Sequence, residues 1–278
     1  AVYPGDLLTA RVSVQKIHQK DRVLELFAEV KNQKGSVVLR GTGRVRFPLE
    51  PKHVQQQSSE DASAPKHALI LGASGALGLA LIKTLAREGI SVSAIFNENP
   101  GQLESLIDNL SKRGMNLMAF KCNLASENDR ERLYAKLADS NREPNFIISC
   151  AAMNPGSTPA MKMSLNEVNS AFQMEVLSLL HFVQLAFSHF STLKYGRVIS
   201  VGSTAALGRP DAGWSRYAIT KSAMETLIKS LAVELGPHGV TCNTVSPGLT
   251  REGMGSQIPT RVHLIATAET PNRNLVTM

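Results

Sequence analysis

The stretch from His67 to Leu85, HALILGASGALGLALIKTL, decides the fold. An apolar run leads directly into a glycine-rich turn, and the turn leads into the apolar spacing of a helix. Gly72, Gly75 and Gly78 are spaced three apart, so the backbone of this turn can approach a pyrophosphate, and the next helix begins with free N–H groups. A glycine turn often serves packing alone, and this one is not G-x-G-x-x-G. Its place on the first strand of an α/β repeat nevertheless favours a dinucleotide site.

From His67 onward, short apolar strands alternate with amphipathic helices, which is the pattern of a parallel α/β sheet. The expected strands cover residues 67–73, 91–96, 116–120, 146–150, 197–201 and 240–245. The expected helices cover residues 77–88, 102–112, 127–137 and 165–190, and a further helix carries Tyr217 and Lys221 and ends near Leu235. The sequence therefore predicts an α/β fold, a Rossmann-type doubly wound parallel sheet with helices on both faces.

The beginning of the chain has a different pattern, in which apolar and polar residues alternate. The alternating runs cover residues 8–14, 22–30 and 37–47. They predict an N-terminal three-stranded antiparallel β segment with one apolar face. The polar stretch that follows, PLEPKHVQQQSSEDASAPK, contains three prolines and predicts an interdomain linker. The expected organisation is a β segment over 1–47, a linker over 48–66 and an α/β domain over 67–278.

Composition makes several classes of function improbable for this chain. Of its 278 residues, 43% are hydrophobic and 19% charged, which is ordinary for a soluble globular protein. The net charge of +7 comes without a Lys/Arg-rich tract, and no apolar run approaches the roughly 20 residues of a membrane span. We therefore expect neither nucleic acid nor a membrane as a partner. No secretory signal is visible, and Cys122, Cys150 and Cys242 are far apart, which predicts reduced thiols and a cytoplasmic protein.

The histidines give no metal-binding pattern. His67, His181, His189 and His238 have no cysteine or carboxylate partner at metal-ligand spacing. We therefore expect structural histidines and no metal site.

A second stretch, Ser203 to Lys221, STAALGRPDAGWSRYAITK, contains residues suited to proton transfer. Tyr217 and Lys221 are four apart, so on a helix their side chains share one face. A nearby ammonium favours the ionised form of a phenol, which brings the phenol towards the range useful for general acid–base catalysis. Ser203 could place a hydroxyl against the same reacting oxygen, and Trp214 lies just before the tyrosine, as a pocket wall or as ordinary packing. Tyr and Lys at this spacing are also common on helix surfaces. Whether Tyr217 and Lys221 are catalytic therefore depends on the motifs around them.

The second expected strand ends in AIFNENPG, where a dinucleotide site distinguishes its two cofactors. An acidic residue there would bind the ribose 2′-hydroxyl of NAD(H), and an arginine would favour the 2′-phosphate of NADP(H). The strand ends in Phe96 and Asn97, and Glu98 is interpreted as a solvated loop charge. The absent acid tilts the prediction towards NADP(H), with NAD(H) as the alternative.

Taken in order, these motifs resemble the short-chain dehydrogenase/reductase family. The glycine turn is similar to the family's phosphate loop, with Ala76 in place of its middle glycine. Asn123-Leu124 stands where the family usually has an aspartate that contacts adenine, and Ser149-Cys150-Ala151-Ala152 stands where it has Asn-Asn-Ala-Gly. Pro247-Gly248-Leu249-Thr250 matches its Pro-Gly turn beside the nicotinamide carboxamide. The cofactor-binding residues that the resemblance implies are Gly72, Ser74, Gly75, Leu77, Gly78, Asn97, Asn123, Leu124, Ala151, Ala152, Tyr217, Lys221, Pro247, Gly248 and Thr250.

The resemblance covers residues 66–278 and implies hydride transfer between a nicotinamide and a carbonyl or secondary alcohol. Ser203, Tyr217 and Lys221 match the family's catalytic serine, tyrosine and lysine. The family's fourth catalytic residue is an asparagine that holds a water chain to the lysine, and it maps onto Glu175. Either Glu175 carries protons in its place, or the alignment is shifted by one turn and Glu175 lies outside the relay.

The N-terminal segment resembles the last three strands of hot-dog-fold hydratases acting on enoyl thioesters, without that family's catalytic residues; a generic meander is the alternative. Such hydratases and 3-oxoacyl thioester reductases catalyse neighbouring steps of acyl-chain metabolism. The pairing therefore favours a 3-oxoacyl thioester substrate, carried on CoA or an acyl carrier protein. A reductase of a small ketone, sugar or steroid is one alternative, and a non-catalytic cofactor-binding or scaffold protein is another.

The resemblance also implies a homo-oligomer whose contacts are supported by one more C-terminal helix and a final strand. The sequence reaches Met278 before both. We therefore expect Val240–Val245 to form an open sheet edge and the chain to be a fragment of a longer bifunctional polypeptide.

Overall fold

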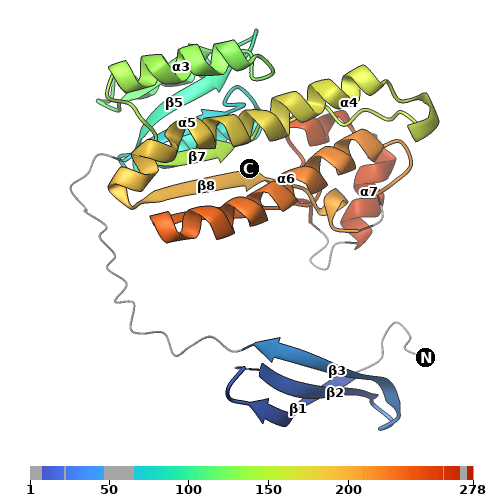
Figure 1. Ribbon diagram of the computed structural model, residues 1–278. Helices are drawn as coiled ribbons and strands as arrows, with labels where there is room; N and C mark the ends of the chain where they lie inside the picture. The colour runs from blue at the N-terminus through green and yellow to red at the C-terminus, as the bar shows by residue number, and fades with distance from the viewer. Residues whose placement is uncertain are drawn as a thin grey trace. The chain divides into compact units, whose positions relative to one another are not determined.

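A computed structural model describes residues 8–21, 23–46, 66–208, 210–258, 260–269 and 274–277. The chain divides into two compact units, Ala1–Ala62 and Ser63–Met278 (Figure 1). Of the predicted linker over 48–66, residues 48–65 lie outside the described residues.

The first unit is a three-stranded antiparallel sheet. Its strands, in the order β1-β2-β3, are β1 (Leu8–His18), β2 (Val23–Asn32) and β3 (Val37–Arg46). The register sets Val14 opposite Leu26, and because side chains alternate across a strand, one face is apolar. The opposite face carries ion pairs, such as Glu25 with Arg44 at 2.8 Å. The predicted three-stranded sheet is confirmed, whereas its hot-dog relationship stays a prediction.

The second unit is built on a six-stranded parallel sheet with the order β6-β5-β4-β7-β8-β9. Its strands are β4 (His67–Leu71), β5 (Ser91–Phe96), β6 (Leu117–Lys121), β7 (Phe146–Ser149), β8 (Gly196–Val201) and β9 (Val240–Val245). The chain builds β4, β5 and β6 outward in one direction and then crosses back to add β7 on the other side of β4. This reversal creates a switch point between β4 and β7, where open α/β sheets bind their ligands.

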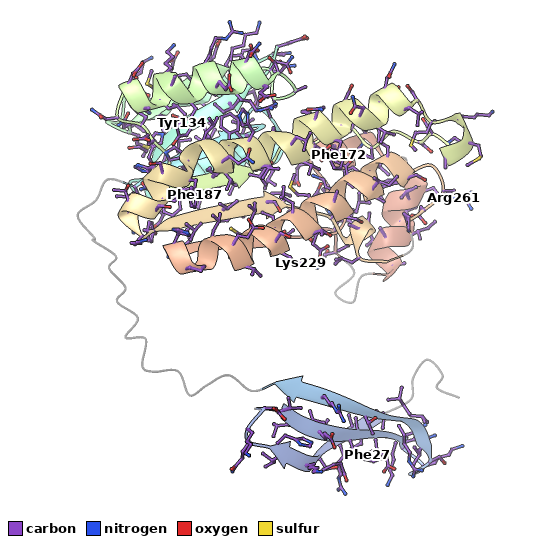
Figure 2. The ribbon with its side chains drawn as sticks, in the orientation of Figure 1. Phe27, Tyr134, Phe172, Phe187, Lys229 and Arg261 are labelled. Atoms are coloured by element: carbon purple, nitrogen blue, oxygen red, sulfur yellow. The ribbon has the colours of Figure 1, made fainter. Side chains whose placement is uncertain are left out.

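Helices cover both faces of this sheet, which confirms the predicted doubly wound α/β fold (Figure 1). They are α1 (Ala76–Arg87), α2 (Leu103–Ser111), α3 (Glu127–Asp139), α4 (Leu165–Phe172), α5 (Ser178–Leu193), α6 (Ser215–Leu235) and α7 (Thr260–Glu269). Every residue of β4 is buried, and its alternating side chains enter two cores. Leu69 and Leu71 pack with α3, α5 and α6, whereas Ala68 and Ile70 pack with α1 and α2. Tyr134 of α3, labelled in Figure 2, belongs to the first of these cores.

The single helix predicted over 165–190 is interrupted in the structure. A π-helical turn, Gln173–Leu177, separates α4 from α5. By length and composition alone, Leu165–Leu193 is apolar enough to cross a membrane, although polar residues interrupt its apolar runs. Its side chains Leu179, Phe182 and Phe190 are fully buried against the sheet, which is the position of a core helix in a folded domain.

The C-terminal part contains a helix that the sequence patterns did not predict. Helix α7 follows a short 3₁₀ segment, Gly253–Gln257, and Val276 forms an isolated parallel bridge with Thr250. Helix α7 was not predicted because its apolar residues are spread around the helix and form no single apolar face, and Leu264 and Ile265 are exposed. Among the described residues, β9 is the last strand on its side of the sheet.

A buried histidine lies at the start of the central strand. His67 is 6% exposed, and its Nε2 lies 2.9 Å from Ser93 Oγ. Asn145 Oδ1 accepts the backbone N–H of His67 at 2.8 Å. Burial, followed by the charge of Arg142, lowers the pKa of His67 to about 4, so the folded protein holds this imidazole neutral.

We expect this histidine to make the fold acid-sensitive. In the unfolded chain His67 takes up a proton near pH ~6.5, whereas in the folded chain it does so near pH 4, so stability falls as pH drops through this window. Between pH 7.0 and 5.5, His67→Gln should lose about 1 kcal/mol less unfolding free energy than the wild type. Urea unfolding at both pH values measures this, with the half-buried His263→Gln as control. Equal acid losses in wild type and His67→Gln would contradict the assignment.

Candidate active site

The turn between β4 and α1 is shaped by glycines at a close backbone approach. Gly72 has a φ of +77°, and a Cβ on it would lie 2.7 Å from the backbone of Ala151 at the end of β7. A Cβ on Gly78 would lie 2.6 Å from Ala73, so this glycine lets α1 pack tightly against the turn. At Gly75 a Cβ would meet only the carbonyl oxygen of Gly72, at 3.5 Å, which leaves the backbone open. The turn therefore fixes the switch point and leaves an accessible backbone at the start of α1.

Two cavities adjoin at this switch point, and both are lined by Gly72 and Ala152. The smaller, of about 260 Å³, contains the predicted residues Ser74, Asn97, Asn123, Leu124 and Ala151. The larger, of about 590 Å³, contains the predicted residues Gly75, Leu77, Gly78, Ser203, Tyr217, Lys221, Pro247, Gly248 and Thr250. The structure thus brings residues from the ends of all six strands of this sheet into one cleft.

The residues of this cleft fit a dinucleotide. The open backbone at Gly75 and the N–H groups at the start of α1 suit a pyrophosphate. The smaller cavity, between the ends of β5 and β6, has the apolar and amide side chains that suit an adenosine. Asn97, directly after β5, carries neither the carboxylate that would bind a ribose 2′-hydroxyl nor the cation that would bind a 2′-phosphate.

Ser203, Tyr217 and Lys221 line the larger cavity together. Ser203 follows the end of β8, and its Oγ accepts the backbone N–H of Ala205 at 3.2 Å. Tyr217 lies in the first turn of α6, where the ring of Trp214 meets it edge-on at 5.7 Å. Lys221 Nζ lies 5.7 Å from the centre of the Tyr217 ring. A hydroxyl, a phenol and an ammonium therefore share one wall.

Glu175 lines neither cavity but contacts Lys221 from behind. Glu175 Oε2 lies 3.0 Å from Lys221 Nζ, and the two side chains are 1% and 3% exposed. Lys221 Nζ also donates to the carbonyl of Val201 at 3.0 Å, and Glu175 Oε1 accepts the backbone N–H of Met153 at 2.9 Å. Glu175 belongs to the π-helical turn, so the interruption of the long helix coincides with this contact. The structure brings Glu175 to the lysine, while its role in proton transfer stays a prediction.

The structure adds residues that sequence reasoning did not identify. The far wall of the larger cavity comes from the 3₁₀ segment and α7, with Met254, Ile258, Val262 and Ala266. Asn154 donates to Gln257, and Arg216 donates to the carbonyl of Asn154, so the loop after β7 is tied to both sides of the cavity. Only the folded loops bring these residues together, and no local sequence pattern marks them.

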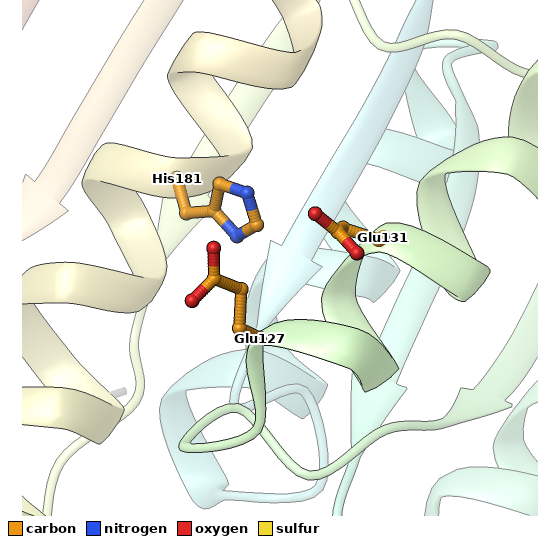
Figure 3. A group of neighbouring side chains, drawn as sticks. All are labelled: Glu127, Glu131 and His181. Atoms are coloured by element: carbon orange, nitrogen blue, oxygen red, sulfur yellow. The ribbon is translucent and has the colours of Figure 1, made fainter.

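A possible cation-binding group lies where the sequence showed none. Glu127 and Glu131 of α3 and His181 of α5 place their ligand atoms within 4.8 Å of one another (Figure 3). The guanidinium of Arg130 lies at this group, because its Nε donates a hydrogen bond to His181 Nδ1 at 2.9 Å. Burial lowers the pKa of Arg130, and the charges of Glu127 and Glu131 oppose that shift. We therefore interpret the two carboxylates as counter-charges of Arg130 rather than as metal ligands. Spacing could not reveal the group, since two separate helices supply it.

A doubly wound sheet with a glycine cradle at its switch point defines the class of Rossmann-type dinucleotide-binding proteins. Within this class, a family model described as short chain dehydrogenase matches residues 66–262, well over half of the chain. The chain therefore belongs to the short-chain dehydrogenase family, which consists of NAD(P)-dependent oxidoreductases. The predicted family relationship is confirmed.

Relatives in the family have several different activities. Dehydrogenase/reductase SDR family member 4 of Homo sapiens is 26% identical over 189 residues, which are 68% of this chain and 67% of that protein. The 2,3-dihydro-2,3-dihydroxybenzoate dehydrogenase of Bacillus subtilis is 27% identical over 190 residues, 68% of this chain and 71% of that protein. The 3-oxoacyl-(acyl-carrier-protein) reductase FabG of Staphylococcus aureus is 24% identical over 184 residues, 66% of this chain and 74% of that protein.

Solved structures show the same fold. An NAD⁺-bound xylitol dehydrogenase has a TM-score of 0.70 at 21% identity, covering 77% of this chain and 87% of that one. A short chain dehydrogenase from Burkholderia cenocepacia in complex with NADP has a TM-score of 0.68 at 24% identity, covering 77% and 85%. Since these two neighbours hold different cofactors, they leave the preference of this chain open.

We expect removal of the Glu175 carboxylate to destabilise the second unit. Glu175→Ala would leave the Lys221 ammonium buried without its counter-charge, which should cost about 3–5 kcal/mol of unfolding free energy. The matched control is Glu225→Ala in the exposed Glu225–Lys229 pair of α6 (Figure 2), where about 0.5 kcal/mol is expected. Chemical unfolding measures both variants, and Glu175→Gln provides a milder test. Similar small losses for Glu175→Ala and Glu225→Ala would contradict a structural role for the buried pair.

Proposed function

We propose that this short-chain dehydrogenase reduces the 3-oxo group of an acyl thioester to a secondary alcohol. The observation that carries the proposal is the character of the larger cavity. Besides Ser203, Tyr217 and Lys221, its lining includes the apolar side chains of Pro155, Trp214, Leu249, Met254, Ile258 and Val262. Among the lining residues that the structure describes, only Lys221 and Asp211 are charged. Such a cavity suits a carbonyl attached to an apolar chain.

The three polar side chains have complementary tasks at the carbonyl oxygen. When bound, the nicotinamide ring supplies the hydride that the carbonyl carbon accepts. The Tyr217 hydroxyl donates a proton to the oxygen, and Ser203 Oγ donates a hydrogen bond that stabilises the negative charge developing there. The carbonyl thus becomes an alcohol, and Tyr217 is left as a phenolate facing the Lys221 ammonium.

The phenolate must then regain a proton. In our proposal the Lys221 ammonium gives a proton towards the Tyr217 phenolate, which leaves a neutral amine. The carboxylate of Glu175, which touches Lys221 Nζ directly, then takes up a proton that comes from solvent and releases it to this amine. Glu175 would in this way do the work of the family's asparagine and its water chain. Its second oxygen is fixed by the N–H of Met153, which lines the smaller cavity, so the carboxylate has one defined orientation.

The apolar side chains of the larger cavity also affect which of the alternative substrate classes would fit. A sugar would leave several hydroxyl groups without partners against Met254, Ile258 and Val262, which disfavours this substrate class. A small ketone or a steroid could pack against the same apolar side chains, and these two classes stay the alternative substrates. The relative named as a 3-oxoacyl-(acyl-carrier-protein) reductase and the hydratase-like N-terminal segment support the acyl thioester, with an acyl carrier protein or CoA as carrier. A non-catalytic role is disfavoured because Ser203, Tyr217 and Lys221 share one cavity wall.

Two further properties belong to the proposal. We propose NADP(H) as the preferred cofactor, because Asn97 leaves the end of β5 without the carboxylate that would favour NAD(H). We also propose a reducing, cytoplasmic setting, supported by the free thiols of Cys122, Cys150 and Cys242. Burial raises the pKa of Cys122 and of Cys242 to about 11, so these thiols are poor nucleophiles.

Tyr217→Phe should lower kcat by about a hundredfold to ten-thousandfold, because the phenol is the proton donor. Cofactor affinity should stay within about threefold, since the ring and Lys221 remain in place. Steady-state kinetics and fluorescence titration with NADPH measure the two quantities. Tyr195→Phe, at a tyrosine that stacks on Arg197 away from the cleft, is the matched control. Unchanged turnover in Tyr217→Phe would refute the assignment.

A substrate panel tests the proposed reaction. Oxidation of NADPH and NADH is followed with 3-oxoacyl thioesters of increasing chain length, a small ketone, a steroid and an aldose. We expect kcat/KM to be highest for the 3-oxoacyl thioesters and to rise with chain length, because each added methylene is buried against the apolar wall. A preference for the aldose would overturn the substrate class, and binding of either cofactor without turnover of any carbonyl would favour the non-catalytic alternative.

A further inference from the structure

A separate cavity lies between α1 and α2, on the opposite face of the sheet from Tyr217. It has a volume of about 510 Å³ and shares no lining residue with the two cavities of the cleft. Its apolar part is formed by Leu79, Leu106, Leu110 and Met115. Its polar part includes three cationic side chains, which are Lys83, Arg87 and Arg113.

These three cations converge from different elements. Lys83 and Arg87 are four apart on α1, so they project from the same side of that helix, and Arg113 follows the end of α2. No acidic residue lines the cavity. Among the residues that the structure describes, none of the three cations has a hydrogen-bond or ion-pair partner. Three like charges around one hollow repel one another, and an anion would relieve that repulsion.

Some basic side chains of the second unit have an acidic partner. Arg132 lies 2.5 Å from Asp129, and Lys229 lies 2.7 Å from Glu225. The dipole of α1 accounts for Arg87 in its last turn, but not for Arg113, which belongs to the segment after another helix. Glu104 and Asp108, the acids of α2, do not line the cavity. Lys83, Arg87 and Arg113 are therefore distinguished by lining one hollow together, without an acid among its described lining residues.

We propose that the cavity between α1 and α2 binds a small organic phosphate. Lys83, Arg87 and Arg113 would hold the phosphate, because several converging cationic donors match its oxygens. The leucines and Met115 would cover an apolar or planar body attached to it. Gln102, Ser105 and Asn109 add neutral donors at the rim. The site is independent of the reductase proposal, because it uses none of the residues of the cleft.

Isothermal titration calorimetry of the full chain tests this with three probes: phenyl phosphate, inorganic phosphate and phenol. Each titration is run with and without excess NADPH, so that any phosphate that enters the dinucleotide cleft is recognised by its displacement. We expect phenyl phosphate to bind in both cases, inorganic phosphate to bind more weakly and phenol to show no binding. A rise in KCl should weaken the binding of phenyl phosphate.

Variants locate the binding. Lys83→Ala and Arg113→Ala should each weaken phenyl phosphate by roughly tenfold, and Arg113→Glu should abolish binding. Lys229→Ala removes an exposed lysine of α6 and should change nothing. NADPH oxidation by Lys83→Ala and Arg113→Ala should equal that of the wild type, so a failure of the reductase proposal would leave this result untouched. Equal affinity of the wild type and the double variant Lys83→Ala/Arg113→Ala, binding that NADPH abolishes, or equal affinity for phenyl and inorganic phosphate would overturn the proposal.

Discussion

The buried contact between Glu175 and Lys221 is the interaction on which the rest of the candidate site depends. Through it the π-helical turn after α4 meets α6, and the same two side chains bind the carbonyl of Val201 at the end of β8 and the N–H of Met153 after β7. Four segments far apart in sequence are thereby fixed around two opposite charges. A charged pair this deeply buried needs further hydrogen bonds, and each member has one to the backbone, whereas Glu175 Oε2 has only the ammonium beside it.

The second constraint is steric and acts at the other side of the cleft. Gly72 approaches Ala151 so closely that any side chain would push β4 and β7 apart at the switch point. This contact holds the carboxyl ends of β4 and β7 side by side, and the cleft begins at the residues that follow these ends. The glycine contact thus shapes the cofactor end of the cleft, and the ion pair shapes its reacting end. They meet at the loop after β7, which includes both Ala151 and Met153.

The sequence was sufficient for the parts of this architecture that depend on local patterns. The six parallel strands, the glycine turn and the Tyr217–Lys221 spacing follow from apolar periodicity and motif order. What could not be predicted depends on tertiary packing. The π-helical turn inserts one residue into a helix whose apolar pattern is continuous, α7 lacks an amphipathic pattern, and Arg130 meets His181 only because two helices pack together. The apolar wall of the larger cavity likewise comes from residues whose neighbours in space are not their neighbours in sequence.

The carboxylate of Glu175 determines how much uncompensated charge the candidate site contains. Without it, the Lys221 ammonium beside the Tyr217 ring would be a buried charge with no counter-charge. With a negative charge 3.0 Å from the ammonium, the field at the cavity is the weaker field of an ion pair. The carbonyl of Val201 and the N–H of Met153 hold the two charged groups in place from either side. The position of the ammonium beside Tyr217 is therefore set by tertiary packing of the folded chain and not by the four-residue spacing alone.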